Sequence, residues 1–240
     1  MNNLDLFDLQ LLPYFKLIDI VFRELKRPKV NFYNIELLFD ILKVDINIKE
    51  NDIHNTPLHY SSVYNNNELT SYLLELGAQI NNQNKYGMTP LHMACDLNCD
   101  ETIKNLLEHE ADVNILNKDL ENPLMLYVKS GKKISIINLL IKSGTDLNQK
   151  DEYGKSILER IITFNNKNAF SILVNYIDIN TILSFGVTPL MQSVMTTKYD
   201  IVSYLLDNGA DTSIKINGST AWDLADNETK REFPNLNPKN

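Results

Sequence analysis

The side chains with the clearest capacity for metal chemistry are one histidine and the two cysteines that follow it. His92, Cys95 and Cys99 are three and then four residues apart, so a helix would place all three on one face. Imidazole and thiolate are zinc ligands, but a structural zinc site takes four ligands and the chain has no further cysteine. We therefore interpret the trio as structural and expect neither a metal nor a cofactor.

Patterns that could support catalysis are equally sparse. Asp223 and Asp226 could act as paired carboxylates, but nothing around them predicts the cleft that acid–base catalysis needs. No P-loop, nucleophile elbow or glycine-rich phosphate cradle occurs in the sequence. We predict that the protein is not an enzyme and has no catalytic residue.

The segment that carries His92 is one copy of a phrase that returns along the chain. Thr56-Pro57-Leu58-His59 is followed 33 residues later by Thr89-Pro90-Leu91-His92. Further copies, worn to different degrees, begin at Asn122, Ser156, Thr188 and Thr220, so the steps are 33, 33, 34, 32 and 32 residues. A fixed period of this length is typical of stacked repeat arrays. Such arrays offer an extended recognition surface more readily than an enclosed pocket.

Each copy predicts two short helices and a turn. The threonine can cap a helix with its hydroxyl, and the proline after it suits the first helical position, where its missing N–H costs nothing. Apolar residues at helical spacing, such as Ile103, Leu106 and Leu107, indicate the second helix. That helix is expected to end at a left-handed glycine in several copies, namely Gly77, Gly144 and Gly209.

Taken together, these motifs resemble the ankyrin repeat. The resemblance rests on the cap phrase, on the tail from Leu73 to Asn81 and on the 33-residue step, and it covers roughly residues 51–226. It implies repeats made of two antiparallel helices and a finger, with a concave face that binds proteins. We predict an all-α fold, an ankyrin-repeat solenoid of helix-turn-helix repeats with short β-hairpin fingers.

The period also predicts how the chain is divided. Residues 1–50 read as a degenerate repeat that covers the open end of the stack, although an amphipathic helix that binds a partner or a membrane is the alternative. The last copy is followed by prolines that stop a helix, which indicates a half repeat and a tail. The predicted segments are 1–50, 51–83, 84–116, 117–150, 151–182, 183–214 and 215–240, of which 151–182 is degenerate.

Composition narrows the classes of function. A net charge of −8 argues against nucleic-acid binding, which needs a basic stripe. No apolar run approaches the ~18 residues of a membrane span. The acidic start, Met1 to Asp5, lacks the basic residues of a secretory signal, and two cysteines are too few for a disulfide scaffold. We expect a cytoplasmic protein.

The resemblance assigns a partner-binding surface to particular repeat positions. The residue three before each cap lies on a finger, and the residues seven and eight after the cap face the concave groove. Large apolar side chains at such positions are typical interface anchors; the alternative is that the rings only cover seams between neighbouring fingers. The candidates at these positions are Ile53, Tyr64, Tyr86, Leu97, Tyr153, Phe164, Phe185 and Met195. Met88, two residues after Tyr86, is added to them.

Several copies depart from the pattern, and the departures carry predictions. His54 and Leu120 replace the finger glycine, while Glu110 and Tyr176 replace the glycine that ends the second helix. A side chain with a Cβ is strained at a positive φ, so these turns are expected to differ from the family pattern. The copy at 151–182 has lost its Thr-Pro, its histidine and its glycine together, and we predict that it is the weakest joint of the stack.

We expect the protein to bind a protein partner, and to bind neither nucleic acid nor membrane. The sequence is rich in Asn, Ile, Lys and Tyr, which is typical of proteins from AT-rich genomes. With its degenerate copies it resembles ankyrin proteins of large DNA viruses and intracellular bacteria, which implies a host-directed adaptor or inhibitor. Two alternatives stay open, an endogenous scaffold or inhibitor of a cellular signalling protein and a self-assembling structural solenoid. Self-assembly would need apolar residues exposed on an end repeat; without them, the unbound chain is expected to be a monomer.

Overall fold

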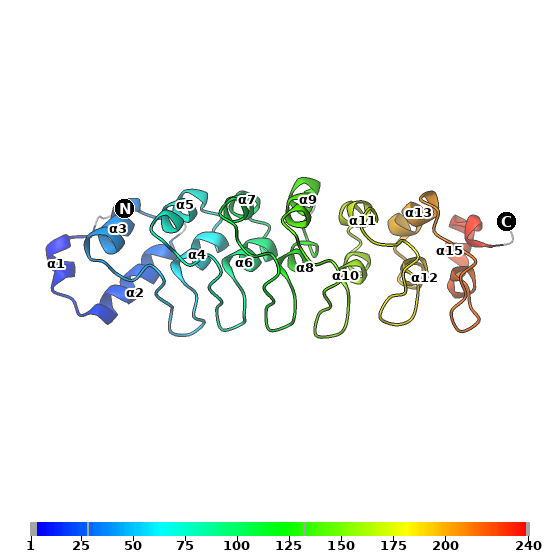
Figure 1. Ribbon diagram of the computed structural model, residues 1–240, viewed down its shortest axis with the longest axis horizontal. Helices are drawn as coiled ribbons and strands as arrows, with labels where there is room; N and C mark the ends of the chain where they lie inside the picture. Colours follow the sequence, from blue (N-terminus) through cyan, green and yellow to red (C-terminus); the bar gives the residue numbers. More distant parts are fainter. Residues whose placement is uncertain (1–3, 28, 132, 239–240) are drawn as a thin grey trace. The chain divides into compact units, whose positions relative to one another are not determined.

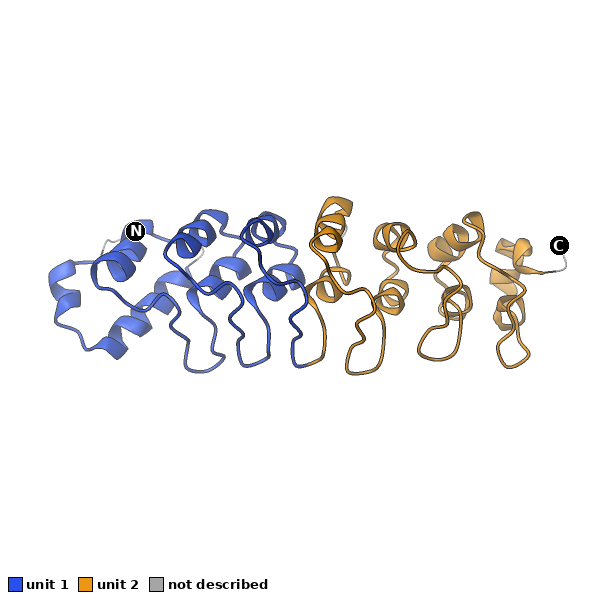
Figure 2. Cartoon of the chain, in the orientation of Figure 1, with its two compact units in different colours: residues 1–118 blue, residues 119–240 orange. Residues whose placement is uncertain are grey.

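Short helices in antiparallel pairs make up most of the computed structural model, which describes residues 4–27, 29–131 and 133–238. Part of the expected N-terminal cap (residues 1–3 and 28) lies outside this range. The chain divides into two units, unit 1 (residues 1–118) and unit 2 (residues 119–240), each with loops that project as fingers on one side (Figures 1 and 2). No strand is formed in the described residues, and β pairing is limited to isolated bridges at Lys150–Ser156 and Ile216–Ser219. The prediction of an all-α ankyrin solenoid is confirmed.

Unit 1 contains three layers of helices. In each copy we call the helix that follows the cap phrase the inner helix and the next one the outer helix. The core of unit 1 is formed by leucines that are almost fully buried, Leu58 and Leu91 on inner helices and Leu73 and Leu106 on outer helices. A π-helical turn, η1, continues α3 directly. The elements are α1 (Leu6–Gln10), α2 (Tyr14–Leu25), α3 (Phe32–Glu36), η1 (Leu37–Ile41), α4 (Pro57–Val63), α5 (Asn67–Glu75), α6 (Pro90–Asp96) and α7 (Asp100–Glu108).

Unit 2 repeats the same arrangement. Ile161 on α10 and Phe170 on α11 are fully buried, and the Phe170 ring meets the edge of Tyr204 on α13 at 5.7 Å between centroids. The elements are α8 (Pro123–Tyr127), α9 (Ile134–Lys142), α10 (Ile157–Thr163), α11 (Lys167–Leu173), α12 (Pro189–Met195), α13 (Tyr199–Asp207), α14 (Ala221–Leu224), α15 (Asn227–Glu232) and η2 (Pro234–Leu236).

The inner helices begin where the cap phrase predicts. Thr89 is the N-cap of α6, and its hydroxyl accepts the N–H of His92 at 3.3 Å. In return, the Nδ1 atom of His92 accepts the N–H of Thr89 at 3.1 Å, so two otherwise unpaired backbone donors are satisfied. The worn copy at 151–182 keeps this arrangement with other residues, because Ser156 and Glu159 form the same reciprocal pair.

Four turns that lack the expected glycine were predicted to differ from the family pattern, and for three of them that prediction is wrong. The φ angles of His54, Leu120 and Glu110 are 59°, 58° and 61°, so these side chains keep a left-handed conformation that favours glycine. The turn at Tyr176 does differ, because Tyr176 is not among the residues with a positive φ. Helix α11 has seven residues instead of the nine in α9 and α13, and its C-cap Val174 keeps a right-handed φ of −62°. The shorter helix ends before Tyr176, so this turn needs no left-handed residue.

The joint that follows the copy at 151–182 is built differently from the others. The carboxylate of Glu159 accepts the N–H of Ser184, 25 residues further on, at 3.1 Å. A cavity of about 130 Å³ lies beside it, with Ile177 and Leu183 among its lining residues. A cavity removes packing contacts from its walls, so the expectation that this joint opens first stays a prediction with a physical basis.

Candidate functional site

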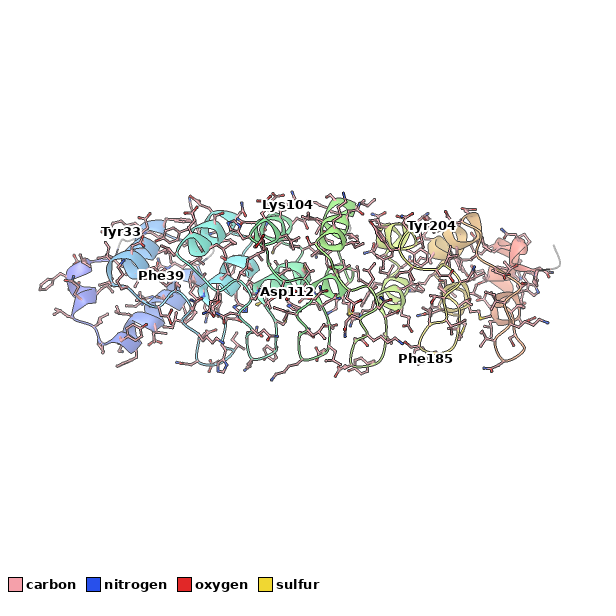
Figure 3. The ribbon with its side chains drawn as sticks, viewed as in Figure 1. Tyr33, Phe39, Lys104, Asp112, Phe185 and Tyr204 are labelled. Atoms are coloured by element: carbon pink, nitrogen blue, oxygen red, sulfur yellow. The ribbon has the colours of Figure 1, made fainter. Side chains whose placement is uncertain are left out.

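Four predicted binding residues lie on the fingers. Tyr86 in unit 1 and Tyr153 and Phe185 in unit 2 expose 52–73% of their surface, whereas Ile53 is half-buried. Figure 3 shows Phe185 at the outer end of its finger. Large rings at these positions contribute little to the core, so their chemistry is available to another molecule.

The fold holds these rings out by means of local polar contacts. The Oδ1 atom of Asn84 accepts the N–H groups of Tyr86 and Met88 at 2.9 and 3.1 Å, which closes the finger of unit 1. Asp151 closes the corresponding finger of unit 2 by accepting the N–H of Tyr153 at 3.0 Å. In these two fingers, a side chain buried at the base therefore fixes the backbone that carries the ring.

A second set of predicted residues lies where the inner helices end. Tyr64, Leu97 and Phe164 are the C-cap residues of α4, α6 and α10, and Met195 is the last residue of α12. All four expose 43–56% of their surface. Tyr64, Leu97 and Phe164 share one repeat position and Met195 lies one position earlier, so each unit presents exposed apolar side chains at the ends of its inner helices.

Neighbouring fingers are joined by their backbones. In unit 1 the N–H of Lys85 donates to the carbonyl of Ile53 at 3.0 Å, and the N–H of Lys118 donates to the carbonyl of Tyr86 at 2.9 Å. In unit 2 the N–H of Glu152 donates to the carbonyl of Asp119 at 2.9 Å. These hydrogen bonds bridge the seams that the rings were alternatively expected to cover.

Met88 differs from the other candidates because its carbonyl is bound by a histidine side chain of the preceding copy. It is half-buried, and its carbonyl accepts a hydrogen bond from Nε2 of His59 at 3.0 Å. The Nδ1 atom of His59 accepts the N–H of Thr56 at 3.1 Å, so the ring links two copies as a neutral imidazole. Burial lowers the pKa of His59 to about 4, which keeps the ring uncharged at neutral pH.

The groups singled out for metal or acid–base chemistry are used within the fold. Cys95 and Cys99 are buried thiols whose pKa values burial raises, which makes them poor ligands and nucleophiles. Asp223 completes the cap of α14, and Asp226 caps α15. Hydrogen bonds from Thr220 and Thr229 lower the pKa values of these two carboxyl groups. In the residues that the structure describes, no three His, Cys, Asp or Glu side chains gather to hold a metal.

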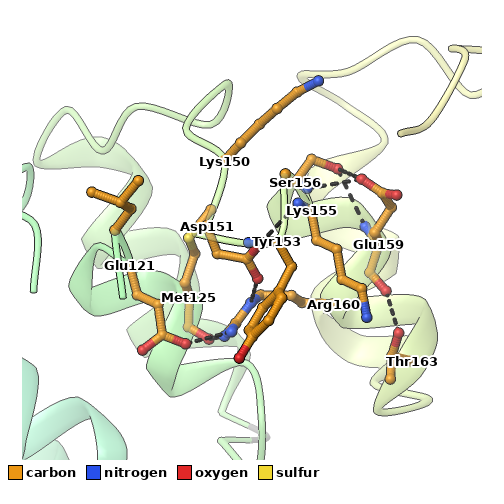
Figure 4. A network of polar contacts seen from close by, with 12 residues as sticks. Glu121, Met125, Lys150, Asp151, Tyr153, Lys155, Ser156, Glu159, Arg160 and Thr163 are labelled. Carbon is orange, nitrogen blue, oxygen red and sulfur yellow. Dashed lines mark hydrogen bonds and ion pairs between the residues drawn. The ribbon is translucent and has the colours of Figure 1, made fainter. Parts of the chain in front are cut away.

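One polar cluster behind the Tyr153 finger was not anticipated from the sequence (Figure 4). The guanidinium of Arg160 donates to Asp151 through Nε at 3.0 Å, to Glu121, and to the carbonyl of Met125 at 3.3 Å. Both carboxylates are buried. The cluster therefore ties the base of the Tyr153 finger to the preceding copy with charge-assisted hydrogen bonds.

The same three repeat positions hold uncharged side chains in unit 1. Asn84 replaces Asp151, Asn55 replaces Glu121 and Met93 replaces Arg160; the amide of Asn84 donates to Asn55 at 2.9 Å and faces the Met93 sulfur at 3.9 Å. The two clusters occupy equivalent positions in their copies, and three residue differences make one neutral and the other charged. Aligning the copies position by position is the signal that would have identified Arg160.

Comparisons with known proteins agree with this architecture. A family model described as ankyrin repeats (3 copies) matches residues 29–117 and 124–216, which is most of the chain. The chain is also similar to OPG189, an ankyrin repeat protein of vaccinia virus (strain Copenhagen), with 27% identity over 196 residues. That alignment covers 80% of this chain but 28% of the viral protein, so the chain spans less than a third of this relative's length. Among the described residues, no helix has the length and apolar character needed to cross a membrane.

Proposed function

This chain belongs to the ankyrin-repeat family, and we propose that it is a non-enzymatic module that binds a partner protein through its finger and inner-helix surface. The observation that carries the proposal is the repetition of exposed rings at one repeat position, Tyr86 in unit 1 and Tyr153 and Phe185 in unit 2. Ankyrin repeats generally mediate protein–protein interaction, and aromatic side chains are the commonest anchors of such interfaces.

The chemistry of these exposed side chains supports this assignment. A ring held at a finger loses little conformational entropy on binding and removes a large apolar area from water. The helix-end residues Tyr64, Leu97, Phe164 and Met195 add apolar surface beside the fingers of their own unit. Fingers and helix ends together provide a mixed polar and apolar surface of the kind that protein interfaces use.

Within this class we propose a host-directed adaptor or inhibitor that works in the cytoplasm. The similarity to an ankyrin repeat protein of vaccinia virus supports a viral type of function. The two free, buried thiols suit a reducing compartment. The runner-up is an endogenous scaffold or inhibitor of a signalling protein, which would have the same binding surface but a partner from its own cell.

The test is affinity capture from a host-cell lysate, with bound proteins identified by mass spectrometry and the strongest one then purified. We expect Tyr86→Ala, Tyr153→Ala and Phe185→Ala each to weaken binding of that protein, by about 2 kcal/mol for a true anchor. Their melting temperatures should stay close to that of the wild type, because the rings are largely exposed.

The matched control is Tyr176→Ala. Tyr176 is also an exposed ring, but it lies after α11 and belongs neither to the finger rings nor to the helix-end residues. It should leave affinity unchanged. If the three finger variants lower the melting temperature and leave affinity intact, the rings cover seams and the proposed surface is wrong.

A further inference from the structure

The first helices of unit 1 carry an apolar surface that the fold leaves open. Residues 11–15, Leu-Leu-Pro-Tyr-Phe, are all exposed, and the ring of Phe7 on α1 is exposed beside them in the sequence. Leu11, Phe7 and Phe15 expose 71%, 69% and 60% of their surface. We call Phe7, Leu11, Leu12, Tyr14 and Phe15 the N-terminal apolar surface. Its residues lie on α1, in the turn that follows α1 and at the start of α2, at the end of unit 1 (Figure 1).

Packing inside unit 1 accounts for only part of these helices. Helix α2 buries Leu17, Val21 and Leu25, which lie beyond its first turn, and α1 buries Leu9 alone. An exposed run of consecutive apolar residues is unfavourable in a water-exposed domain and marks an interaction site. The run therefore has the composition of a face that another protein surface covers.

Over the residues described at the end of unit 2, up to residue 238, the surface is mainly polar. Helix α15, Asn-Glu-Thr-Lys-Arg-Glu, buries only Thr229. The aromatic rings nearby have partners within unit 2, because Lys230 lies over the Trp222 ring at 5.5 Å and Phe233 meets Tyr199 at 5.8 Å. A head-to-tail contact between copies would set the apolar end of one chain against this polar helix. A second copy offers the same apolar surface, and pairing the two surfaces covers both at once.

Charges around the surface suit such a pairing. Asp8 on α1 and Lys16 on α2 are both exposed at its margins. A two-fold axis through the surface places the acidic margin of one copy against the basic margin of the other, which is how self-complementary dimers are built. The cation of Lys16 already lies 5.8 Å from the Phe15 ring centroid, at the edge of the apolar area.

The area is sufficient for a modest dimer. Rings of this type bury about 150–250 Å² each, so the exposed parts of the three rings and two leucines amount to roughly 500 Å². A standard interface buries about 800 Å² on each partner, and the margins would supply the rest. We propose that two copies of this chain associate head to head through the N-terminal apolar surface, as a closed and weak dimer. The proposal replaces the expectation of a monomer.

Sedimentation equilibrium of the full chain, between roughly 1 and 200 µM, tests the proposal. The mass should rise from that of one chain to that of two and then level off. Leu11→Asp combined with Phe15→Asp should weaken association at least ~10-fold with unchanged helical circular dichroism, because burying an unpaired carboxylate is unfavourable. The control, Tyr176→Asp combined with Ile134→Asp, changes exposed apolar side chains of unit 2 that lie outside the proposed partner-binding surface, and it should leave association within about 2-fold.

Three results would overturn the proposal. A mass of one chain at every concentration excludes the dimer, and co-sedimentation of that monomer with lipid vesicles would assign the surface to a membrane instead. A mass that keeps growing beyond two chains indicates head-to-tail assembly. Equal weakening by the control pair places the interface elsewhere. Recovery of association in Asp8→Lys combined with Lys16→Asp, after loss in Lys16→Asp alone, would support the two-fold charge pairing.

Discussion

Replacing Arg160 by methionine should be among the most damaging single changes in unit 2. The side chains of Arg160, Asp151 and Glu121 expose 13%, 2% and 6% of their surface, so the guanidinium neutralises two buried carboxylates. Lys129 lies 3.9 Å from the Glu121 carboxylate and can compensate for part of that charge only. Arg160→Met removes its hydrogen bonds and leaves both carboxylates with almost no water. Breaking a buried ion pair by removing one partner costs about 3–5 kcal/mol. That is a large share of the 5–15 kcal/mol, roughly, that stabilises a domain.

The chain supplies a matched control for this change. Converting Glu121 and Asp151 to asparagine together with Arg160→Met reproduces the neutral set Asn55–Asn84–Met93 of unit 1. Replacing a buried ion pair by well-packed neutral groups is often neutral or stabilising. We expect the triple variant to lie within about 1 kcal/mol of the wild type, although it differs from the damaging single variant by two further substitutions.

Urea unfolding followed by circular dichroism measures both variants, and amide hydrogen exchange assigns the loss to a unit. The single variant should lower the transition midpoint and lose protection in α8 to α11, with α4 to α7 unaffected. The reasoning would be refuted if Arg160→Met cost less than about 1 kcal/mol, or if the triple variant were as unstable as the single one. The first result would mean that water reaches the carboxylates, and the second that the charges themselves are not the cause.

Three further predictions concern stability. The pKa of His59 falls from its ordinary 6.5 to about 4 on folding, so between these two pH values mainly the unfolded state takes up the proton. The free energy of unfolding of unit 1 is therefore highest above pH 6.5 and falls towards pH 4, by about 2 kcal/mol at pH 5. Urea unfolding at pH 7.5 and pH 5 should show this loss in the wild type and not in His59→Gln. Thr197 has a φ of 53°, where three equivalent turns hold asparagine, so Thr197→Asn should raise the free energy of unfolding by up to about 1 kcal/mol; no gain in thermal melting would contradict the assigned strain. Residues 151–182 should exchange amide hydrogens faster than residues 84–116, and equal protection would count against a weak joint.

The features that the sequence predicted best are local ones. The hydroxyl of Thr89 was expected to cap the helix that follows it, and the structure has this hydrogen bond; the return bond to Nδ1 of His92 adds to it. The expectation that a side chain with a Cβ would change the turn failed at His54, Leu120 and Glu110 and held at Tyr176, which lies in a copy that is one residue short. When a helix ends two residues early, the position that follows it no longer needs a positive φ.

The features that escaped prediction depend on residues far apart in the chain. Arg160 reaches a carboxylate 39 residues earlier, and neither residue is unusual in its own neighbourhood. The exposure of Phe15 was missed for a related reason. An apolar segment predicts that a helix is covered, but which of its turns meets the next layer is decided by packing: Leu17, Val21 and Leu25 are covered, and Phe15 is not. Only comparison between copies, or the fold itself, reveals such relationships.

The Arg160 cluster also limits how this gene can gain and lose copies. Repeat proteins change length by recombination that deletes or duplicates one period at a time. Glu121 belongs to the copy at 117–150, whereas Asp151 and Arg160 belong to the next. Excision of the first copy alone would remove one of the two carboxylates that balance a buried guanidinium. In unit 1 the corresponding residues are uncharged, so deleting one of its copies would leave no unpaired buried charge at this position. We expect length variants among relatives to delete these two copies as a pair, or else to carry neutral substitutions at the positions left behind.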